Sequence, residues 1–119
     1  MYPLSKDSDL SFLIGKEICQ IAIGRHDLQL NWGNGGISIW STFIYRRAGA
    51  TDEVVWSDDN PDIAARAIPL LYASITAARC SERGSLELSF SNGDQLELLE
   101  DERYESFSIR DGKAPEIIV

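Results

Sequence analysis

A hairpin pattern that occurs twice in the sequence constrains the fold more than any other feature. In residues 86–98 apolar and polar residues alternate on either side of Asn92-Gly93, which is typical of two antiparallel strands joined by a tight turn. Residues 28–39 repeat the pattern around Asn34-Gly35. Asn-Gly favours a type I′ turn, in which both central residues have positive φ. The sequence therefore predicts two β hairpins of the same design. The matching apolar residues are Leu28 and Leu86, Leu30 and Leu88, and Trp32 and Phe90.

The similarity continues outside the hairpins. Residues from about 13 to 47 and from about 70 to 110 each read as a short helical piece followed by a β meander, so we predict an internal duplication. Two such halves can bury their apolar faces against each other. The expected fold is α+β, mainly antiparallel β, with the halves forming a sandwich or a barrel-like sheet in a single domain of residues 1–119.

One clear helix is expected over about residues 61–72. Asn60 is a suitable capping residue and Pro61 suits the first helical position, while Pro69 should kink the helix or end it near Ile68. A short helical turn is expected to end at Gly15. The apolar residues that would share one face of the longer helix are Ile63, Ala64, Ala67, Ile68 and Leu71. Besides the hairpins, strands are expected at residues 18–23, 37–47, 53–56, 75–80, 104–110 and 116–119.

The chain is acidic, with 19 Asp and Glu against 11 Lys and Arg and a formal net charge of −8. Nucleic-acid binding draws most of its affinity from basic contacts to phosphate, so DNA and RNA are not expected as partners. A basic protein partner is one explanation of the acidity, and solubility alone is the other. No apolar stretch is long enough to span a membrane, and no signal peptide is apparent. These features favour a cytoplasmic protein of bacterial type.

The residues offer little catalytic chemistry. His26 is the only histidine, no Gly-x-Ser-x-Gly elbow is present, and one His with two separated Cys cannot form a usual zinc site. Cys19 and Cys80 alternate with apolar residues, so both read as small core residues with free thiols. We therefore expect no catalytic residue, no metal and no cofactor, and an enzyme is the less favoured class.

Two acidic clusters are the candidate binding sites, one around Trp56 and one after the second hairpin. Solvated loop charge is the plain alternative for both clusters. Trp40 and Trp56 are the tryptophans best placed for exposure, although the core is the favoured location for either. The candidate binding residues are Trp56, Asp58, Asp59, Glu100, Asp101, Glu102, Tyr104 and Glu105.

Residues 84–93 read Gly-Ser-Leu-Glu-Leu-Ser-Phe-Ser-Asn-Gly and are followed by Leu96 and by Tyr-Glu-Ser-Phe at 104–107. This stretch resembles a family of small uncharacterised bacterial proteins with a Gly-x-Leu-x-Leu-x-Phe-x-Asn/Asp-Gly hairpin and a Tyr-Glu-x-Trp/Phe motif. The opening at residues 13–21 is similar to the start of that family. The resemblance implies a domain of unknown function and carries no active site, because its motifs are turn and core residues. Some acidic bacterial proteins of this size are immunity proteins that block toxins. This similarity concerns only size and charge, and it assigns no role to any residue.

Three hypotheses follow. The first is a non-enzymatic protein-interaction module, of immunity type or otherwise, that binds a basic partner. The second is a small-ligand binder or enzyme that uses a cleft between the two β halves, with Trp40 or Trp56 beside carboxylates. The third is a homodimer formed by pairing exposed strand edges.

Overall fold

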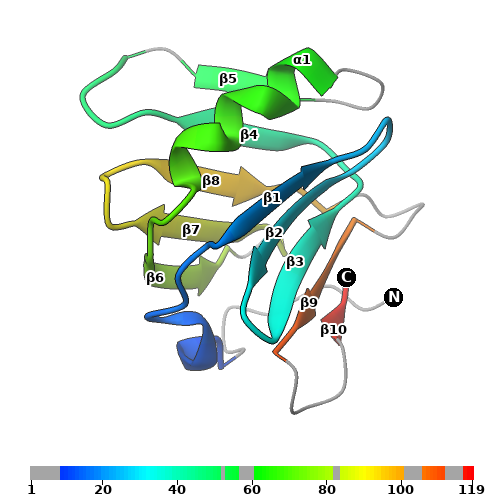
Figure 1. Cartoon of the computed structure of the whole chain (residues 1–119), viewed down its shortest axis with the longest axis vertical. Coiled ribbons are helices and arrows are strands. Elements are labelled where there is room, and N and C mark those ends of the chain that lie inside the picture. Colours follow the sequence, from blue (N-terminus) through cyan, green and yellow to red (C-terminus); the bar gives the residue numbers. More distant parts are fainter. Residues whose placement is uncertain (1–8, 52, 57–60, 82–83, 101–105, 112–116) are drawn as a thin grey trace.

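Two five-stranded antiparallel sheets face each other as a sandwich in the part of the chain that the structure describes (Figure 1). This computed structural model describes residues 9–51, 53–56, 61–81, 84–100, 106–111 and 117–119. The first sheet consists, in spatial order, of β1 (Gln20–Ile23), β2 (Leu28–Trp32), β3 (Gly35–Ile39), β9 (Phe107–Arg110) and β10 (Ile117–Ile118). The second consists of β5 (Glu53–Trp56), β4 (Phe43–Arg46), β8 (Gln95–Leu98), β7 (Leu86–Phe90) and β6 (Ile75–Cys80). The predicted mainly antiparallel fold is confirmed, and it is a sandwich because the sheets do not close into a barrel.

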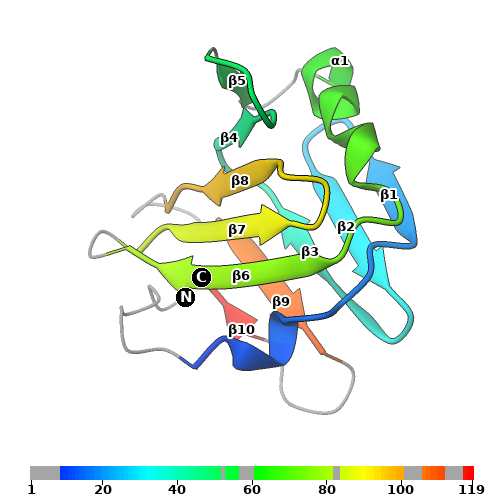
Figure 2. The same cartoon turned by 90° about the vertical axis from the view of Figure 1, so that its left-hand side faces the viewer.

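The core lies between the sheets and is built by the predicted alternation. β2 and β7 have the same pattern, with the first, third and fifth residues buried and the second and fourth half-buried. Their six inward side chains belong to one hydrophobic cluster that also receives residues from β3, β4, β8 and β9. Figure 2 shows how the meander β6–β7–β8 lies across β2, β3 and β9. Because both sheets contribute to one cluster, neither can bury its apolar face without the other.

The chain changes sheets between β3 and β4. The expectation of one strand over residues 37–47 was therefore wrong: β3 ends at Ile39 in the first sheet, and β4 begins at Phe43 in the second. The Ser41 Oγ donates to the Leu99 carbonyl oxygen at 2.6 Å and fixes the crossing segment to the end of β8.

The predicted helix begins at Pro61 but is shorter and changes type. α1 (Pro61–Ala64) is followed by a 3-10 helix, η2 (Ala65–Leu70), which contains Pro69. A 3-10 helix has three residues per turn, so the buried residues are Ala64, Ala67 and Leu70. Ile68, expected on the buried face, is instead 49% exposed. The change of type is consistent with Pro69, which cannot donate the backbone hydrogen bond that an α-helix needs there.

The hairpin turns are not of the predicted type. Tyr72 is the only non-glycine residue with positive φ in the described part of the chain, so neither Asn34 nor Asn92 adopts the type I′ conformation. The β7–β8 turn has three residues between Phe90 and Asp94 and places Gly93 at φ 90°. The Asn92 Oδ1 accepts the Asp94 backbone N–H at 3.0 Å, a local bond that favours this turn.

The two halves meet where the segments before β1 and β6 pair. Ile18 donates its backbone N–H to Ala73, and Tyr72 donates its own to Ile18. The short helix η1 (Ser11–Leu13) precedes the first of these segments and ends before Gly15, as predicted. Cys19 and Cys80 are free as expected, but Cys19 is exposed, so its assignment to the core was wrong.

Candidate functional site

The structure describes two of the eight predicted site residues. Trp56 is fully buried and stacks on Phe43, with 5.2 Å between ring centroids, so its side chain belongs to the core. The alternative that Trp56 is exposed was therefore wrong. Trp40, the other tryptophan considered for exposure, is 38% exposed. Glu100 is half-buried just after β8. The other six predicted residues, which lie outside the described residues, are Asp58, Asp59, Asp101, Glu102, Tyr104 and Glu105.

Charged side chains gather instead on the outer face of the second sheet. They occupy the strand positions that alternate with residues in the core or packed against it, so they point away from the first sheet. The strand order places them on neighbouring strands although they lie far apart in the sequence. We call this set the charged face; its members are Arg46 on β4, Glu53 on β5, Arg79 on β6, Glu87 on β7 and Glu97 on β8.

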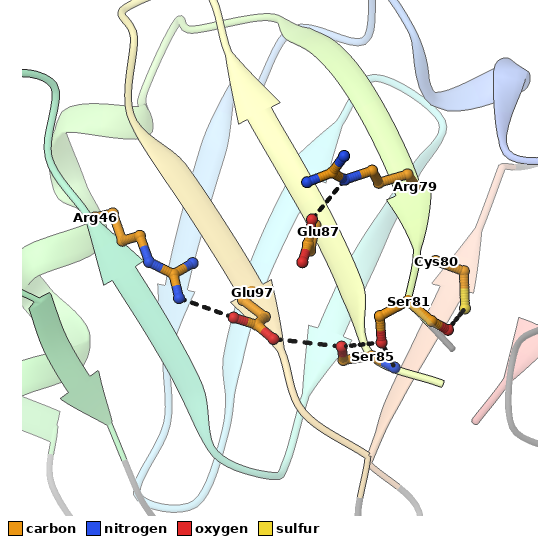
Figure 3. A network of polar contacts seen from close by, with 7 residues as sticks. All are labelled: Arg46, Arg79, Cys80, Ser81, Ser85, Glu87 and Glu97. Atoms are coloured by element: carbon orange, nitrogen blue, oxygen red, sulfur yellow. Dashed lines mark hydrogen bonds and ion pairs between the residues drawn. The ribbon is translucent and has the colours of Figure 1, made fainter. Parts of the chain in front are cut away.

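Two carboxylates lie opposite each other at the centre of the charged face. The strand register pairs Glu87 with Glu97, and like charges at directly opposed positions destabilise a sheet. Each carboxylate is compensated by an arginine from a different neighbouring strand. The Arg79 Nε donates to Glu87 at 2.6 Å, and the Arg46 guanidinium donates to Glu97 at 3.0 Å (Figure 3). The result is a four-charge arrangement with the negative groups inside and the positive groups outside.

The two arginine–glutamate pairs differ in how firmly they are held. Arg46 also contacts Glu53 at 3.2 Å, and the hydrogen bond to Glu97 raises the pKa of its guanidinium. The Ser85 Oγ makes a longer contact of 3.4 Å to the same Glu97. Arg79 has an 81% exposed side chain, and among the described residues it pairs with Glu87 alone. An exposed pair of this kind contributes about 0–1 kcal/mol, so Arg79 can leave Glu87 at little cost.

A hollow of about 480 Å³ opens beside these charges. Its lining includes the small side chains of Ala77 on β6 and Ser89 on β7, together with Arg46 and Arg79. Glu87 and Gln95 also line it. The polar lining differs from the mostly apolar lining of small-molecule pockets. Neither Trp40 nor Trp56 lines it, so it is not the pocket that a cleft between the halves would provide.

Sequence reasoning did not select Arg46, Arg79 or Glu87. The alternation of residues 86–90 had already placed Glu87 on the polar side of its strand, which was the available signal. The partner strands were not apparent, because β4 joins β8 across 49 or more residues of sequence.

At the end of β6, burial raises the pKa of the Cys80 thiol, which keeps it in its unreactive protonated form.

No group of three or more His, Cys, Asp and Glu side chains suited to a metal ion occurs among the described residues. None of the described helices is long and apolar enough to cross a membrane.

The fold and the charged face define a small β-sandwich protein with a polar, hollowed sheet surface. The chain belongs to a family of unknown function, DUF6188, whose model matches residues 10–119. This agrees with the expected membership of an uncharacterised family. Neither the curated proteins nor the solved structures contain a match to the chain.

Proposed function

We propose that this protein is a protein-interaction module that binds a basic segment of a partner on the charged face. The observation that carries the proposal is the opposed pair Glu87 and Glu97, of which one is compensated by an exposed arginine. A lysine or arginine of a partner can take the place of Arg79 beside Glu87. The adjoining hollow offers space for the rest of the incoming side chain.

The overall charge supports a basic partner. The formal net charge of −8 attracts cationic surfaces at a distance and speeds encounter, while the opposed carboxylates Glu87 and Glu97 select the docking position on the charged face. Blocking a basic toxin is one role of this type, and it requires no chemistry from the module itself.

The test uses hexalysine as a defined probe, with hexaglutamate as the probe of opposite charge. We expect hexalysine to shift the backbone amide NMR signals of β6, β7 and β8 in a saturable and salt-sensitive manner. The double variant Glu87→Gln/Glu97→Gln should bind about fivefold to tenfold more weakly, because the attracting charges are gone. Glu17→Gln is the matched control, since Glu17 is exposed and lies outside the charged face.

The proposal fails if the double variant and the control bind hexalysine equally well, or if the shifted signals lie in the first sheet. A third variant, Arg79→Gln, separates displacement from simple attraction. Because loss of any positive charge strengthens the attraction to hexalysine, the matched variant is Arg25→Gln, at an exposed position outside the charged face. If a partner cation replaces Arg79 at Glu87, Arg79→Gln should bind hexalysine more tightly than Arg25→Gln does.

A further inference from the structure

The two sheets place an arginine at matching positions, and these arginines have different partners. Arg46 is the last residue of β4 and lies opposite Gln95 of β8. Arg110 is the last residue of β9 and lies opposite Gly36 of β3. Arg46 is neutralised by Glu97 and Glu53. Arg110 contacts a serine and an asparagine instead, and neither of them carries a charge.

Both contacts of Arg110 are to neutral oxygen atoms. Its Nη1 donates to the Ser38 Oγ at 3.2 Å, and its Nη2 donates to the Asn31 Oδ1 at 3.1 Å. No carboxylate forms an ion pair with Arg110 within the described part of the chain. A guanidinium has five N–H donors, so three remain available after these two bonds. A half-buried cation without a counter-charge is unfavourable and gains by binding an anion.

The guanidinium is held in place before any anion binds. Asn31 directs its oxygen towards Arg110 because its Nδ2 donates to the Gln20 Oε1 at 3.2 Å. Gly36 provides the space: a Cβ there would lie 2.8 Å from the Arg110 Nη2 and 2.2 Å from the Asn31 Oδ1. The absence of a side chain at position 36 thus allows the guanidinium to lie over the strand.

We propose that Arg110, with Ser38 and Asn31, forms a carboxylate-binding site on the outer face of the first sheet. A carboxylate suits the site because its two oxygens match the planar fork of a guanidinium. The Ser38 hydroxyl is buried and accepts from Arg110, so it fixes the guanidinium, whose remaining N–H groups meet the bound anion. The carboxylate belongs to a small organic acid or to an acidic residue or C-terminus of a partner protein. This site is separate from the charged face and does not depend on the proposed function.

The test follows the side-chain Nε–Hε NMR signals of the arginines during titration with sodium acetate at constant ionic strength. We expect a saturable shift for Arg110 and little change for Arg46, which is already neutralised. This comparison within one unaltered protein needs no variant. Unsaturable drift of Arg110, or equal shifts of both arginines, would overturn the proposal.

Asn31→Asp is the sharpest variant because it has almost the same shape and supplies a carboxylate to Arg110 from within the chain. It should weaken acetate binding at least tenfold, and Arg110→Gln should do the same. Arg46→Gln is the matched control and should leave acetate binding unchanged. Retained binding in Asn31→Asp, or tighter binding of inorganic phosphate than of acetate, contradicts a carboxylate site. If a short acidic peptide binds more tightly than acetate, the carboxylate comes from a protein partner. If the peptide binds equally well or more weakly, the ligand is a small organic acid.

Discussion

Asp94 is a buried carboxylate that connects three parts of the molecule through hydrogen bonds. It accepts the hydroxyl of Tyr45 from β4, and its other oxygen accepts the Ala48 backbone N–H at 2.9 Å. Asn92 donates to Asp94 at 3.2 Å and also lies 3.1 Å from the Pro69 carbonyl oxygen of η2. The β7–β8 turn is thereby fixed to the end of β4 and to the helical segment. A buried charge is tolerated here because several donors satisfy it.

Tyr45→Phe should therefore destabilise the protein by about 1–3 kcal/mol, because it leaves a buried acceptor with one partner fewer. Urea unfolding measures the difference. Tyr72→Phe is the control: Tyr72 is 74% exposed, so removal of its hydroxyl should change the free energy of unfolding by less than about 0.5 kcal/mol. An equal loss in both variants would show that Asp94 does not depend on the Tyr45 hydroxyl.

The Tyr45 hydroxyl also makes the stability of the unaltered protein depend on pH. Burial, and then the bond to Asp94 and its charge, raise the pKa of Tyr45 above its ordinary value of 10.0. The folded state consequently retains a proton that the unfolded state loses, so stability falls as the pH rises above about 10. Unfolding curves of the unaltered protein should show this fall, and those of Tyr45→Phe should show a smaller one.

Residues whose role depends on distant parts of the chain could not be predicted from the sequence. The buried residues of β2 and β7 were predicted correctly, because local alternation determines which face they occupy. Tyr72 was not predicted to have φ 67°, since its conformation depends on pairing with the segment around Ile18. For the same reason the sequence did not indicate the charged face, which requires the order of strands in the second sheet.

At the level of whole elements, close contact between β3 and β9 joins the two halves in the first sheet. A Cβ on Gly35 would lie 2.0 Å from the Arg110 carbonyl oxygen and 2.7 Å from the Trp32 Nε1. Such a distance is far below van der Waals contact, and a backbone atom cannot rotate away. Glycine at position 35 is thus required by the approach of a second strand, although sequence analysis had assigned it to a type I′ turn.

Gly35→Ala should lower the free energy of unfolding by about 2 kcal/mol or more, because β9 must move away from β3. Gly33→Ala is the matched control in the same hairpin. Position 33 has open space around it and no positive φ, so alanine there should be neutral or slightly stabilising. Thermal unfolding of both variants measures the contrast. A loss of the same size at position 33 would assign the cost to the turn rather than to the contact between strands.

At the scale of the whole molecule, the two sheets have the same construction. A shift of strand numbers by five converts β1–β2–β3–β9–β10 into β6–β7–β8–β4–β5. Each half supplies three strands to one sheet and its last two strands to the other. The helices follow the same rule, since η1 contacts β6 and η2 contacts β1. This arrangement supports our proposal that the halves arose by duplication, which remains a prediction.

The exchange of strands has a consequence for folding, because neither half contains a complete sheet. Separately produced residues 9–60 and 61–119 would each lack two strands of one sheet and three strands of the other, and with them much of the core, so each half should be unfolded as a monomer. Mixing them should restore a folded one-to-one complex, seen by circular dichroism and by size-exclusion chromatography.

A half that unfolds cooperatively as a monomer would contradict this prediction. A folded homodimer of residues 9–60 would support the prediction further, because β4 and β5 of one copy would then occupy the positions of β9 and β10 in the other. That dimer is the assembly from which a duplicated chain of this construction can arise, since fusing its two copies requires no change of strand order.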